Sequence, residues 1–171
     1  MPDLPVKTPE QLVILASIVE KETGKPEERG HIAGIYLNRL RLGMKLQADP
    51  TILYVLSSHG TKPLGRPLDH RDLSADTPYN TYLHDGLPPG PIANPGRAAL
   101  LAAVRPEATD DLYFVSDGNG AHHFGRTLEE QNRNIKILRK QQATRPPDEN
   151  NVPAYGILSP APFEPTWGHH R

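Results

Sequence analysis

Glu20 is the ionisable residue whose surroundings in the sequence best suit proton-transfer chemistry. It directly follows the longest apolar stretch of the chain, residues 12–19, and the residues one helical turn before it, Ala16 and Ser17, are small. A carboxyl beside apolar surface favours its neutral form and can act as a general acid near neutral pH. An ordinary exposed glutamate close to a helix end would show the same spacing, so the pattern by itself leaves both interpretations open.

A second set of polar and aromatic side chains lies in segments rich in turn-forming residues. Amide groups and aromatic rings suit a carbohydrate ligand, because they offer hydrogen bonds to hydroxyl and acetamido groups and flat faces to sugar rings. Helix capping by Asp49 and Asn94, each directly before a proline, and core packing by Tyr79 and Tyr82 would explain the same residues equally well. The set consists of Gln47, Asp49, Tyr79, Asn80, Thr81, Tyr82 and Asn94.

Two adjacent histidines, His122 and His123, lie on a predicted strand, where neighbouring side chains point to opposite faces. At most one of them can therefore point into a given site. The chain contains no cysteine and no pair of histidines with the HExxH spacing of zinc enzymes. It also lacks the nucleophile elbow of serine hydrolases, the phosphate-binding loop and the dinucleotide-binding fingerprint. We therefore expect neither a metal ion nor a cofactor.

Capping signals and helical spacing predict the elements that must position these residues. A capping box at residues 8–11 opens a first helix that Gly24 ends, and a second helix over 26–42 forms a helical hairpin with it. The glycine- and proline-rich segment 86–96 is predicted to be a stiff functional loop. We expect an α+β fold, in which the helical hairpin and further helices pack on a small antiparallel sheet. Further elements are predicted over 50–56 (helical or extended), 95–105 (helix), 112–116 paired with 121–125 (hairpin) and 127–142 (helix).

Length and composition favour a single domain with a core of its own, since the chain has 171 residues of which 36% are apolar. Lysine and arginine (19) nearly balance aspartate and glutamate (20). The basic surplus of nucleic-acid-binding proteins is therefore missing, and we exclude nucleic acid as a partner. The longest apolar stretch is far shorter than the ~20 residues of a membrane span.

Proline is concentrated at the C-terminal end of the chain. Six of the 19 prolines lie within residues 146–171, a segment with neither helical nor alternating apolar spacing. We therefore predict a folded domain over residues 1–143 and a mobile, proline-rich tail over residues 144–171. Docking of this tail on the domain through Tyr155, Phe163 and Trp167 is the alternative.

Six sequence motifs follow one another in a fixed order within residues 11–140. They are LASIVEKET (15–23), YLNRLRLGMKLQADPT (36–51), PYNTY (78–82), GLPPGPIANPG (86–96), LYFV (112–115) and GAHHF (120–124). On these motifs the chain resembles the endolytic murein transglycosylase family, also called YceG-like. Several long motifs in order are far more specific than any single short pattern.

The resemblance implies that residues 1–143 form a catalytic domain that cleaves peptidoglycan glycan strands internally, between N-acetylmuramic acid and N-acetylglucosamine. It identifies Glu20, the glutamate after Ile-Val in the first motif, as the catalytic residue. Protonated Glu20 would donate its proton to the bridging oxygen. The carboxylate would then take the proton of the muramyl 6-hydroxyl, which closes on C1 and leaves a 1,6-anhydro end. This reaction consumes no water and needs no cofactor.

The resemblance also supports a set of substrate-binding residues around Glu20. His122, and not His123, matches the position of the family's histidine. We expect amide and imidazole groups to hold the acetamido groups and to stabilise positive charge on the sugar, with Asp49 as an electrostatic helper. The expected substrate-binding residues are Gln47, Asp49, Tyr79, Asn80, Tyr82, Asn94 and His122.

Two other functions stay open on the residues. A muramidase would use Glu20 and Asp49 as a pair of carboxylates and would hydrolyse the strand with water. A non-catalytic module would bind glycan within a wall-synthesis complex without turning it over. Cleavage of purified, uncrosslinked glycan strands separates the catalytic functions from the non-catalytic one.

Members of this family usually carry an N-terminal membrane helix and a smaller extra domain, and neither is present in these 171 residues. The resemblance therefore implies a longer protein, held by that missing anchor at the outer side of the bacterial cytoplasmic membrane, in the periplasm. The present fragment is expected to be soluble. Glycan strands would be its substrate, and cell-wall synthases are candidate partners.

Overall fold

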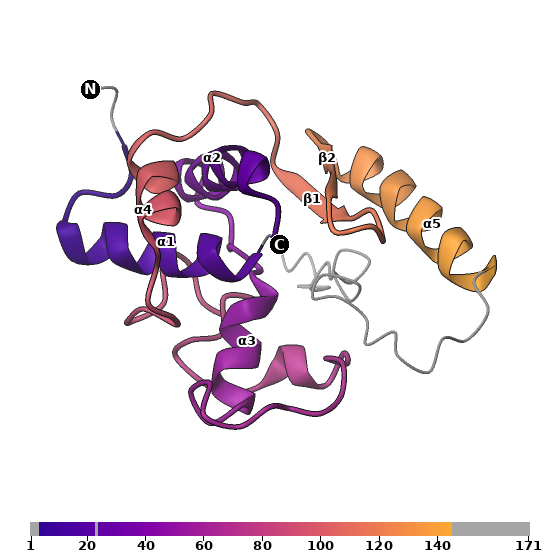
Figure 1. Ribbon diagram of the computed structural model, residues 1–171, viewed down its shortest axis with the longest axis horizontal. Coiled ribbons are helices and arrows are strands. Elements are labelled where there is room, and N and C mark those ends of the chain that lie inside the picture. Colours follow the sequence, from indigo (N-terminus) through magenta and orange to yellow (C-terminus); the bar gives the residue numbers. More distant parts are fainter. Residues whose placement is uncertain (1–3, 23, 145–171) are drawn as a thin grey trace, which may run out of the picture.

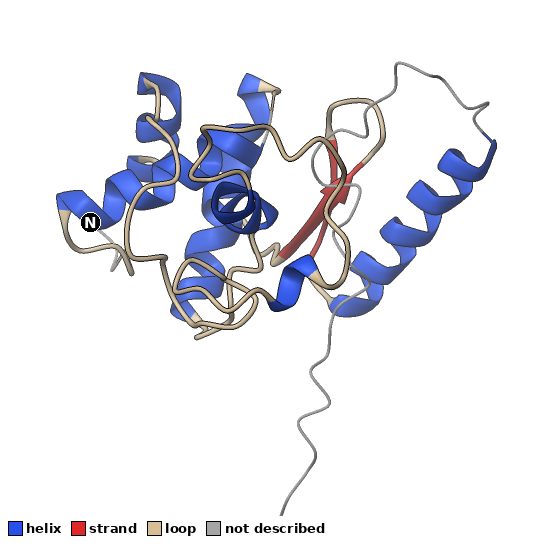
Figure 2. Ribbon diagram, turned by 90° about the horizontal axis from the view of Figure 1, so that it is seen from below, coloured by secondary structure: helices blue, strands red, loops and turns tan. Residues whose placement is uncertain are grey.

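The computed structural model describes residues 4–22 and 24–144. Most of its helices gather on one side of a two-stranded hairpin, and the last helix covers the other side (Figures 1 and 2). Helices dominate and the sheet is small and antiparallel, which confirms the predicted α+β class. The elements are α1 (Pro9–Glu22), α2 (Arg29–Arg41), α3 (Asp49–Leu56), α4 (Arg97–Val104), β1 (Tyr113–Ser116), β2 (His122–Gly125) and α5 (Leu128–Thr144), with 3-10 turns at Pro26–Glu28 and Asp72–Ser74.

The helical hairpin forms where the sequence predicts it. The Gln11 backbone N–H donates to Thr8 Oγ1 at 3.2 Å, and Gln11 Oε1 accepts from the Thr8 N–H at 3.3 Å, so the capping box of α1 is confirmed. The second predicted helix is divided into the 3-10 turn Pro26–Glu28 and α2. Gly43, with a φ of 68°, follows the end of α2 in the left-handed conformation that glycine adopts without strain.

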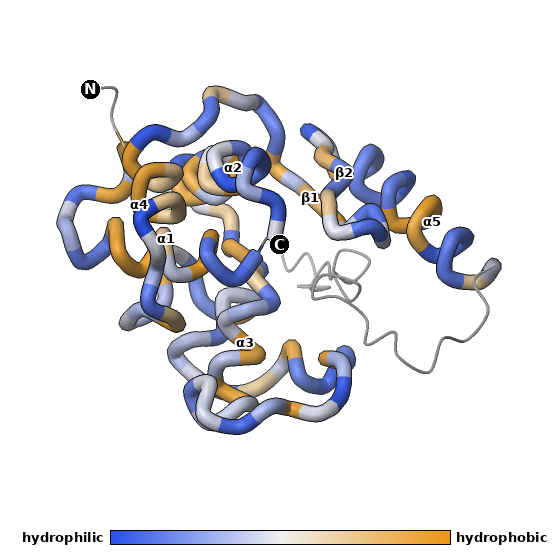
Figure 3. Tube along the Cα trace, in the orientation of Figure 1, coloured by the Kyte–Doolittle hydropathy of each residue, from blue (hydrophilic) through white to orange (hydrophobic). Residues whose placement is uncertain are grey.

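The main core lies where α1, α2 and α4 meet, and the apolar segments of α1 and α4 run through this cluster (Figure 3). α1 buries the unbroken stretch 14–19, and α2 adds Ile32 and Tyr36. The buried residues of α4 are all alanines, and such small side chains let helices approach closely. Burial of these six consecutive residues fixes α1 firmly, so the last turn of this helix, which carries Glu20, has a defined position.

The β-hairpin connects this helical cluster to α5. β1 and β2 pair with Phe114 opposite Phe124. On one side the Phe114 ring meets the Tyr36 ring of α2 edge-on, with centroids 5.7 Å apart. On the other side Val115 packs with Ile135 and Leu138 of α5.

α5 begins with the predicted capping box, in which the Glu130 N–H donates to Thr127 Oγ1 at 3.2 Å. The helix continues to Thr144, so the first residue of the predicted tail is helical. The remainder of that tail lies outside the described residues, and its predicted mobility stays a prediction. Within the described part of the chain, no helix has both the length and the apolar character that crossing a bilayer requires.

Two capping predictions are wrong. Asp49 is the first residue of α3 and not its cap, because the helix already begins one residue before Pro50. Its carboxyl accepts a hydrogen bond from the Tyr82 hydroxyl instead. Asn94 lies exposed outside α4, because Gly96 takes an extended conformation (φ −73°, ψ 171°) and the helix starts only after it.

Candidate active site

The last turn of α1 presents two glutamates to different surroundings. Glu20 is half-buried, and its Oε1 atom lies 3.5 Å from the point where a side chain on Gly96 would begin. The carboxyl therefore faces the N-terminal end of α4, a place where a helix favours negative charge. Among the described residues it has neither a hydrogen bond nor an ion pair.

Glu22 continues the buried stripe of α1 formed by Leu15, Ile18 and Val19, which lie one and two turns before it. The residue as a whole is half-buried, but its carboxyl is turned inward and accepts a hydrogen bond from the Tyr36 hydroxyl of α2. The pKa of Glu22 is raised to about 8, mainly by burial and to a smaller extent by the charge of Asp49, while the Tyr36 hydrogen bond acts against both. The raised pKa favours the protonated form of this carboxyl at neutral pH.

Asp49 sits in a similar environment. The Tyr82 hydroxyl donates a hydrogen bond to its carboxyl, and burial raises the pKa of Asp49 to about 7. The site thus holds two carboxyl–phenol pairs, one from α1 and α2 and the other from α3 and the segment 78–82. Helices α1 and α3 contact each other, and the charge of Asp49 raises the pKa of Glu22.

The nearby cation of Arg39 serves the framework and not these carboxyls. Its guanidinium is buried and donates to two backbone carbonyls, that of Leu112 at 2.6 Å and that of Lys45 at 2.8 Å. It also lies 4.9 Å from the centre of the Tyr113 ring. Within the described residues, no cation is hydrogen-bonded to Glu22 or Asp49, and such a partner would favour their ionised forms.

Asn80 holds the segment 78–82 in shape. The residue is fully buried, and its side-chain amide donates to the carbonyls of Leu73 (2.9 Å) and Ala75 (2.8 Å). Its carbonyl oxygen accepts from the Tyr82 N–H at 2.8 Å. Its side-chain amide is therefore engaged within the protein and helps to present Tyr82 to Asp49, and the predicted substrate contact of Asn80 stays a prediction.

Thr81 and Gln47 join this segment to the start of α3. Thr81 Oγ1 lies 2.9 Å from both the Ala48 backbone nitrogen and Thr51 Oγ1. The Gln47 N–H donates to the Thr81 carbonyl at 3.1 Å and Gln47 itself has a φ of 48°. This left-handed conformation costs a residue other than glycine about 1–2 kcal/mol, and such positions cluster at functional sites. The geometry therefore supports a functional position for Gln47.

The segment 86–96 lies over α1 on the side of Glu20. The Ile92 N–H donates to Ser17 Oγ at 3.0 Å, one helical turn before Glu20. The Tyr79 hydroxyl lies only 2.9 Å from the point where a side chain on Gly90 would begin, so a larger residue there would displace it. Tyr79 therefore lies against this loop, whereas Asn94 is exposed.

His122 is connected to the Glu22 carboxyl only indirectly, through the rings of Phe114 and Tyr36. Its Nδ1 lies 3.3 Å from Glu28 Oε1, and its backbone N–H donates to Glu28 Oε2 at 3.0 Å. The imidazole meets the Phe114 ring edge-on at 5.3 Å, and Phe114 in turn meets Tyr36. Its side chain is only 6% exposed, so His122 supports the aromatic wall behind Glu22 and offers little surface to a ligand.

Glu22 and Tyr36 are the functional candidates that the sequence analysis missed. The available signal was the spacing of Glu22 from Leu15, Ile18 and Val19, which places the glutamate on the most apolar face of α1. The described residues contain no group of three or more histidine, aspartate or glutamate side chains arranged to hold a metal ion. Proton transfer by a buried carboxyl is the chemistry that this arrangement supports best.

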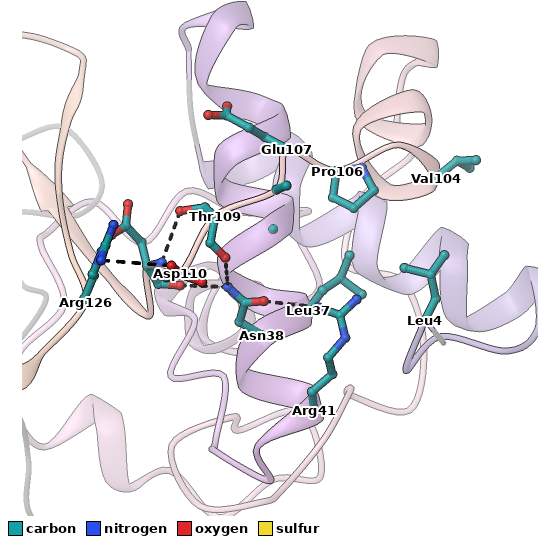
Figure 4. Close-up of a pocket in the computed structure, with 13 residues that line it drawn as sticks. Leu4, Leu37, Asn38, Arg41, Val104, Pro106, Glu107, Thr109, Asp110 and Arg126 are labelled. Atoms are coloured by element: carbon teal, nitrogen blue, oxygen red, sulfur yellow. Dashed lines mark hydrogen bonds and ion pairs between the residues drawn. The ribbon is translucent and has the colours of Figure 1, made fainter. Parts of the chain in front are cut away.

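A cavity of about 740 Å³ lies away from the carboxyls of the candidate site, between α2 and the segment 104–111 (Figure 4). Asn38 lines it and donates to the backbone carbonyls of Thr109 (2.7 Å) and Asp111 (3.1 Å). Arg41 and Arg126 reach it from two sides. It contains none of the predicted site residues, and we do not assign it to the active site.

Comparison with known proteins gives one consistent result. The model of the YceG-like family matches residues 2–137. A protein of Bacillus subtilis named endolytic murein transglycosylase is 43% identical over 123 residues, which are 72% of this chain and 33% of the relative. A protein of the same name from Streptococcus pneumoniae D39 is 36% identical over 129 residues, 75% of this chain and 23% of the relative.

A solved structure agrees with these sequence matches. The crystal structure of a YceG-like protein from Listeria monocytogenes superposes with a TM-score of 0.64 at 42% identity, covering 72% of this chain and 38% of that one. The chain thus spans about a quarter to a third of the curated relatives that it matches.

Proposed function

The chain belongs to the YceG-like family, and we propose that it is the catalytic domain of an endolytic peptidoglycan transglycosylase. The domain would cut glycan strands between N-acetylmuramic acid and N-acetylglucosamine and leave 1,6-anhydro-muramyl ends. The names of the relatives support the activity. The mechanism is supported best by the carboxyl of Glu22 at the end of α1, which accepts a hydrogen bond from the Tyr36 hydroxyl and whose pKa burial raises to about 8.

One carboxyl performs both proton transfers in this mechanism. The acid gives its proton to the bridging oxygen as the bond from C1 to that oxygen breaks, and positive charge develops on the sugar ring. The resulting carboxylate then takes the proton of the muramyl 6-hydroxyl while O6 bonds to C1. Atoms balance without water, and the carboxyl is protonated again at the end of the cycle.

Glu22 is the proposed acid of this cycle. A general acid works best when its pKa lies near the operating pH, and burial raises the pKa of Glu22 to about 8. The Tyr36 hydroxyl donates to Glu22 Oε1 and fixes the orientation of the carboxyl. Glu20, the residue implied by the sequence motif, is the alternative proton donor, and it faces the loop 86–96 and the start of α4.

Asp49 assists as a neighbour in this proposal. Its charge raises the pKa of Glu22, so it helps to keep the acid protonated. A muramidase would instead need Asp49 ionised, as nucleophile or general base. The hydrogen bond from the Tyr82 hydroxyl engages one oxygen of Asp49 and supports the assisting role of this carboxyl. Gln47 and Asn94 are the proposed contacts to acetamido groups.

Glutamine variants of the two glutamates test this assignment. Glutamine nearly preserves shape but cannot donate or accept the required proton, so Glu22→Gln should reduce cleavage of uncrosslinked glycan strands by about 10²–10⁴-fold. Glu20→Gln, the matched control two residues away, should retain most of the activity. Melting temperatures must stay near that of the parent. The reverse pattern, with Glu20→Gln inactive and Glu22→Gln active, would return the catalytic role to Glu20.

A further inference from the structure

A pocket of about 280 Å³ opens beside the last turn of α1, between that turn, α3 and the loop after α3. Its volume is close to the lower end of the range of about 300–1,000 Å³ that is typical of small-molecule sites. Two of its lining residues are chain neighbours of the site carboxyls. Lys21 lies between Glu20 and Glu22, and Pro50 follows Asp49. The pocket therefore lies against the two helices, α1 and α3, that carry these carboxyls.

The chemistry of the pocket is apolar inside and cationic at its edge. Leu53, Leu64 and Ile92 supply the apolar lining. Lys21 and Lys62 are exposed, and no carboxylate of the described residues lies within ion-pair distance of either ammonium group. The residues that line the pocket include no acidic side chain. Such a site favours a ligand with a small apolar part and a carboxylate.

The wall after α3 is built in advance of any ligand. Ser58, His59 and Gly60 all have a positive φ, which costs energy at the first two positions. The turn is held by hydrogen bonds from the His59 N–H to the Tyr54 carbonyl (2.8 Å) and from the Gly60 N–H to Ser57 Oγ (3.0 Å). The His59 ring stacks on the Tyr54 ring, with centroids 4.7 Å apart and planes 9° apart. This turn positions Lys62 at the pocket edge.

We propose that this pocket is a subsite for the acidic peptide that muramic acid carries in peptidoglycan, so that the domain prefers peptide-bearing strands to bare ones. The inference rests on the proposed function. The peptide begins with alanine and continues with an acidic residue, which matches an apolar lining with two ammonium groups at its edge. Only the first part of the peptide fits into the volume.

Binding of a soluble muramyl peptide tests the subsite without cleavage. The probe is N-acetylmuramyl-alanyl-glutamate, and binding to the whole chain is followed by calorimetry. We expect Lys62→Gln to weaken binding about two- to fivefold, the size typical of one exposed ion pair, and Lys62→Glu to weaken it more. Lys136→Glu on α5 is the matched control and should leave binding unchanged. Absence of binding, or equal binding by all four proteins, would overturn the subsite.

Cleavage separates failure of the subsite from failure of the proposed function. The parent should have a lower KM for peptide-bearing strands than for strands stripped of peptide by an amidase. Lys62→Gln should reduce this difference while leaving the rate on stripped strands unchanged. Equal KM values for both strands would overturn the subsite and leave the transglycosylase standing. Binding of the probe that depends on Lys62, without cleavage of either strand, would support the subsite and contradict the proposed function.

Discussion

Two carboxyls two residues apart on α1 have different surroundings. The Glu20 carboxyl faces the start of α4, whereas the Glu22 carboxyl is turned into the core and accepts a hydrogen bond from a tyrosine hydroxyl. Removal of a carboxyl from water favours its neutral form, and this effect of burial outweighs the opposing effect of the Tyr36 hydrogen bond. A glutamate that is protonated near neutral pH can first donate its proton as an acid, and the resulting carboxylate can then act as a base.

Replacement of Tyr36 by phenylalanine tests the link between this hydrogen bond and the reaction. The bond lowers the pKa of Glu22, so Tyr36→Phe should raise that pKa further. The alkaline limb of the pH profile of kcat/KM should therefore move to higher pH. Loss of the positioning contact should also lower kcat, by about tenfold at most. Tyr82→Phe, which acts on Asp49, is the control. An alkaline limb that stays in place in Tyr36→Phe would show that Glu22 is not the titrating acid.

At the scale of elements, short local signals predict structure well where the partner is close in the chain. The capping boxes at Thr8 and Thr127 and the hairpin around residues 117–120 are confirmed for this reason. The roles of Asp49 and Asn80 depend on partners more distant in the chain, a tyrosine 33 residues away for Asp49 and the carbonyls of an irregular loop for Asn80. Local spacing carries no information about such partners.

The same limit explains why the sequence indicated Glu20 and missed Glu22. Both glutamates follow the apolar stretch of α1, and only the packing of α2 decides which carboxyl enters the core. Tyr36 lies 14 residues further along the chain, on another helix, and the residues next to Glu22 in the sequence do not indicate this hydrogen bond. The motif identifies the turn of the helix, and the tertiary structure gives the two residues different surroundings, on which the proposal of Glu22 rests.

A pair of glycines on α2 tests how this helix is positioned. A methyl group on Gly34 would lie 2.5 Å from the Glu107 carbonyl oxygen and 3.1 Å from Thr109 Cγ2, so backbone would have to move. We expect Gly34→Ala to reduce the free energy of unfolding by about 1–3 kcal/mol. Gly30→Ala, where the nearest atom is 3.6 Å away, should be neutral or stabilising by up to about 1 kcal/mol. Equal stability of both variants in urea unfolding would contradict this packing.

At the scale of the whole molecule, the site exists only when four segments meet. α1 and α3 supply the two carboxyls, while α2 and the segment 78–82 supply the two tyrosines. The hairpin and α5 back this arrangement through Phe114 and His122. Burying two carboxyls in one site affects the stability of the entire fold. Each must either be protonated or remain charged, which costs the solvation energy of the carboxylate.

The stability of the parent should therefore fall as the pH rises from about 5 to 8. Burial raises the pKa of Glu22 from 4.5 to about 8 and that of Asp49 from 3.8 to about 7. Within this window the folded state binds more protons than the unfolded state, so the free energy of unfolding decreases with pH, by about 1.4 kcal/mol for each unit of raised pKa. The double variant Glu22→Gln/Asp49→Asn should lose much less stability over the same range. A parent that is as stable at pH 8 as at pH 5 would contradict the burial of these carboxyls.

The most direct test of a single-carboxyl transglycosylase is the fate of water during cleavage. Uncrosslinked glycan strands are digested in water enriched in heavy oxygen, and the new muramyl ends are analysed by mass spectrometry and by reduction with borohydride. If the muramyl 6-hydroxyl closes on C1, the ends will be one water lighter than hydrolytic ends, resistant to borohydride and free of heavy oxygen. Reducible muramic acid that carries the heavy label as the main product would contradict the transglycosylase and favour the two-carboxylate muramidase.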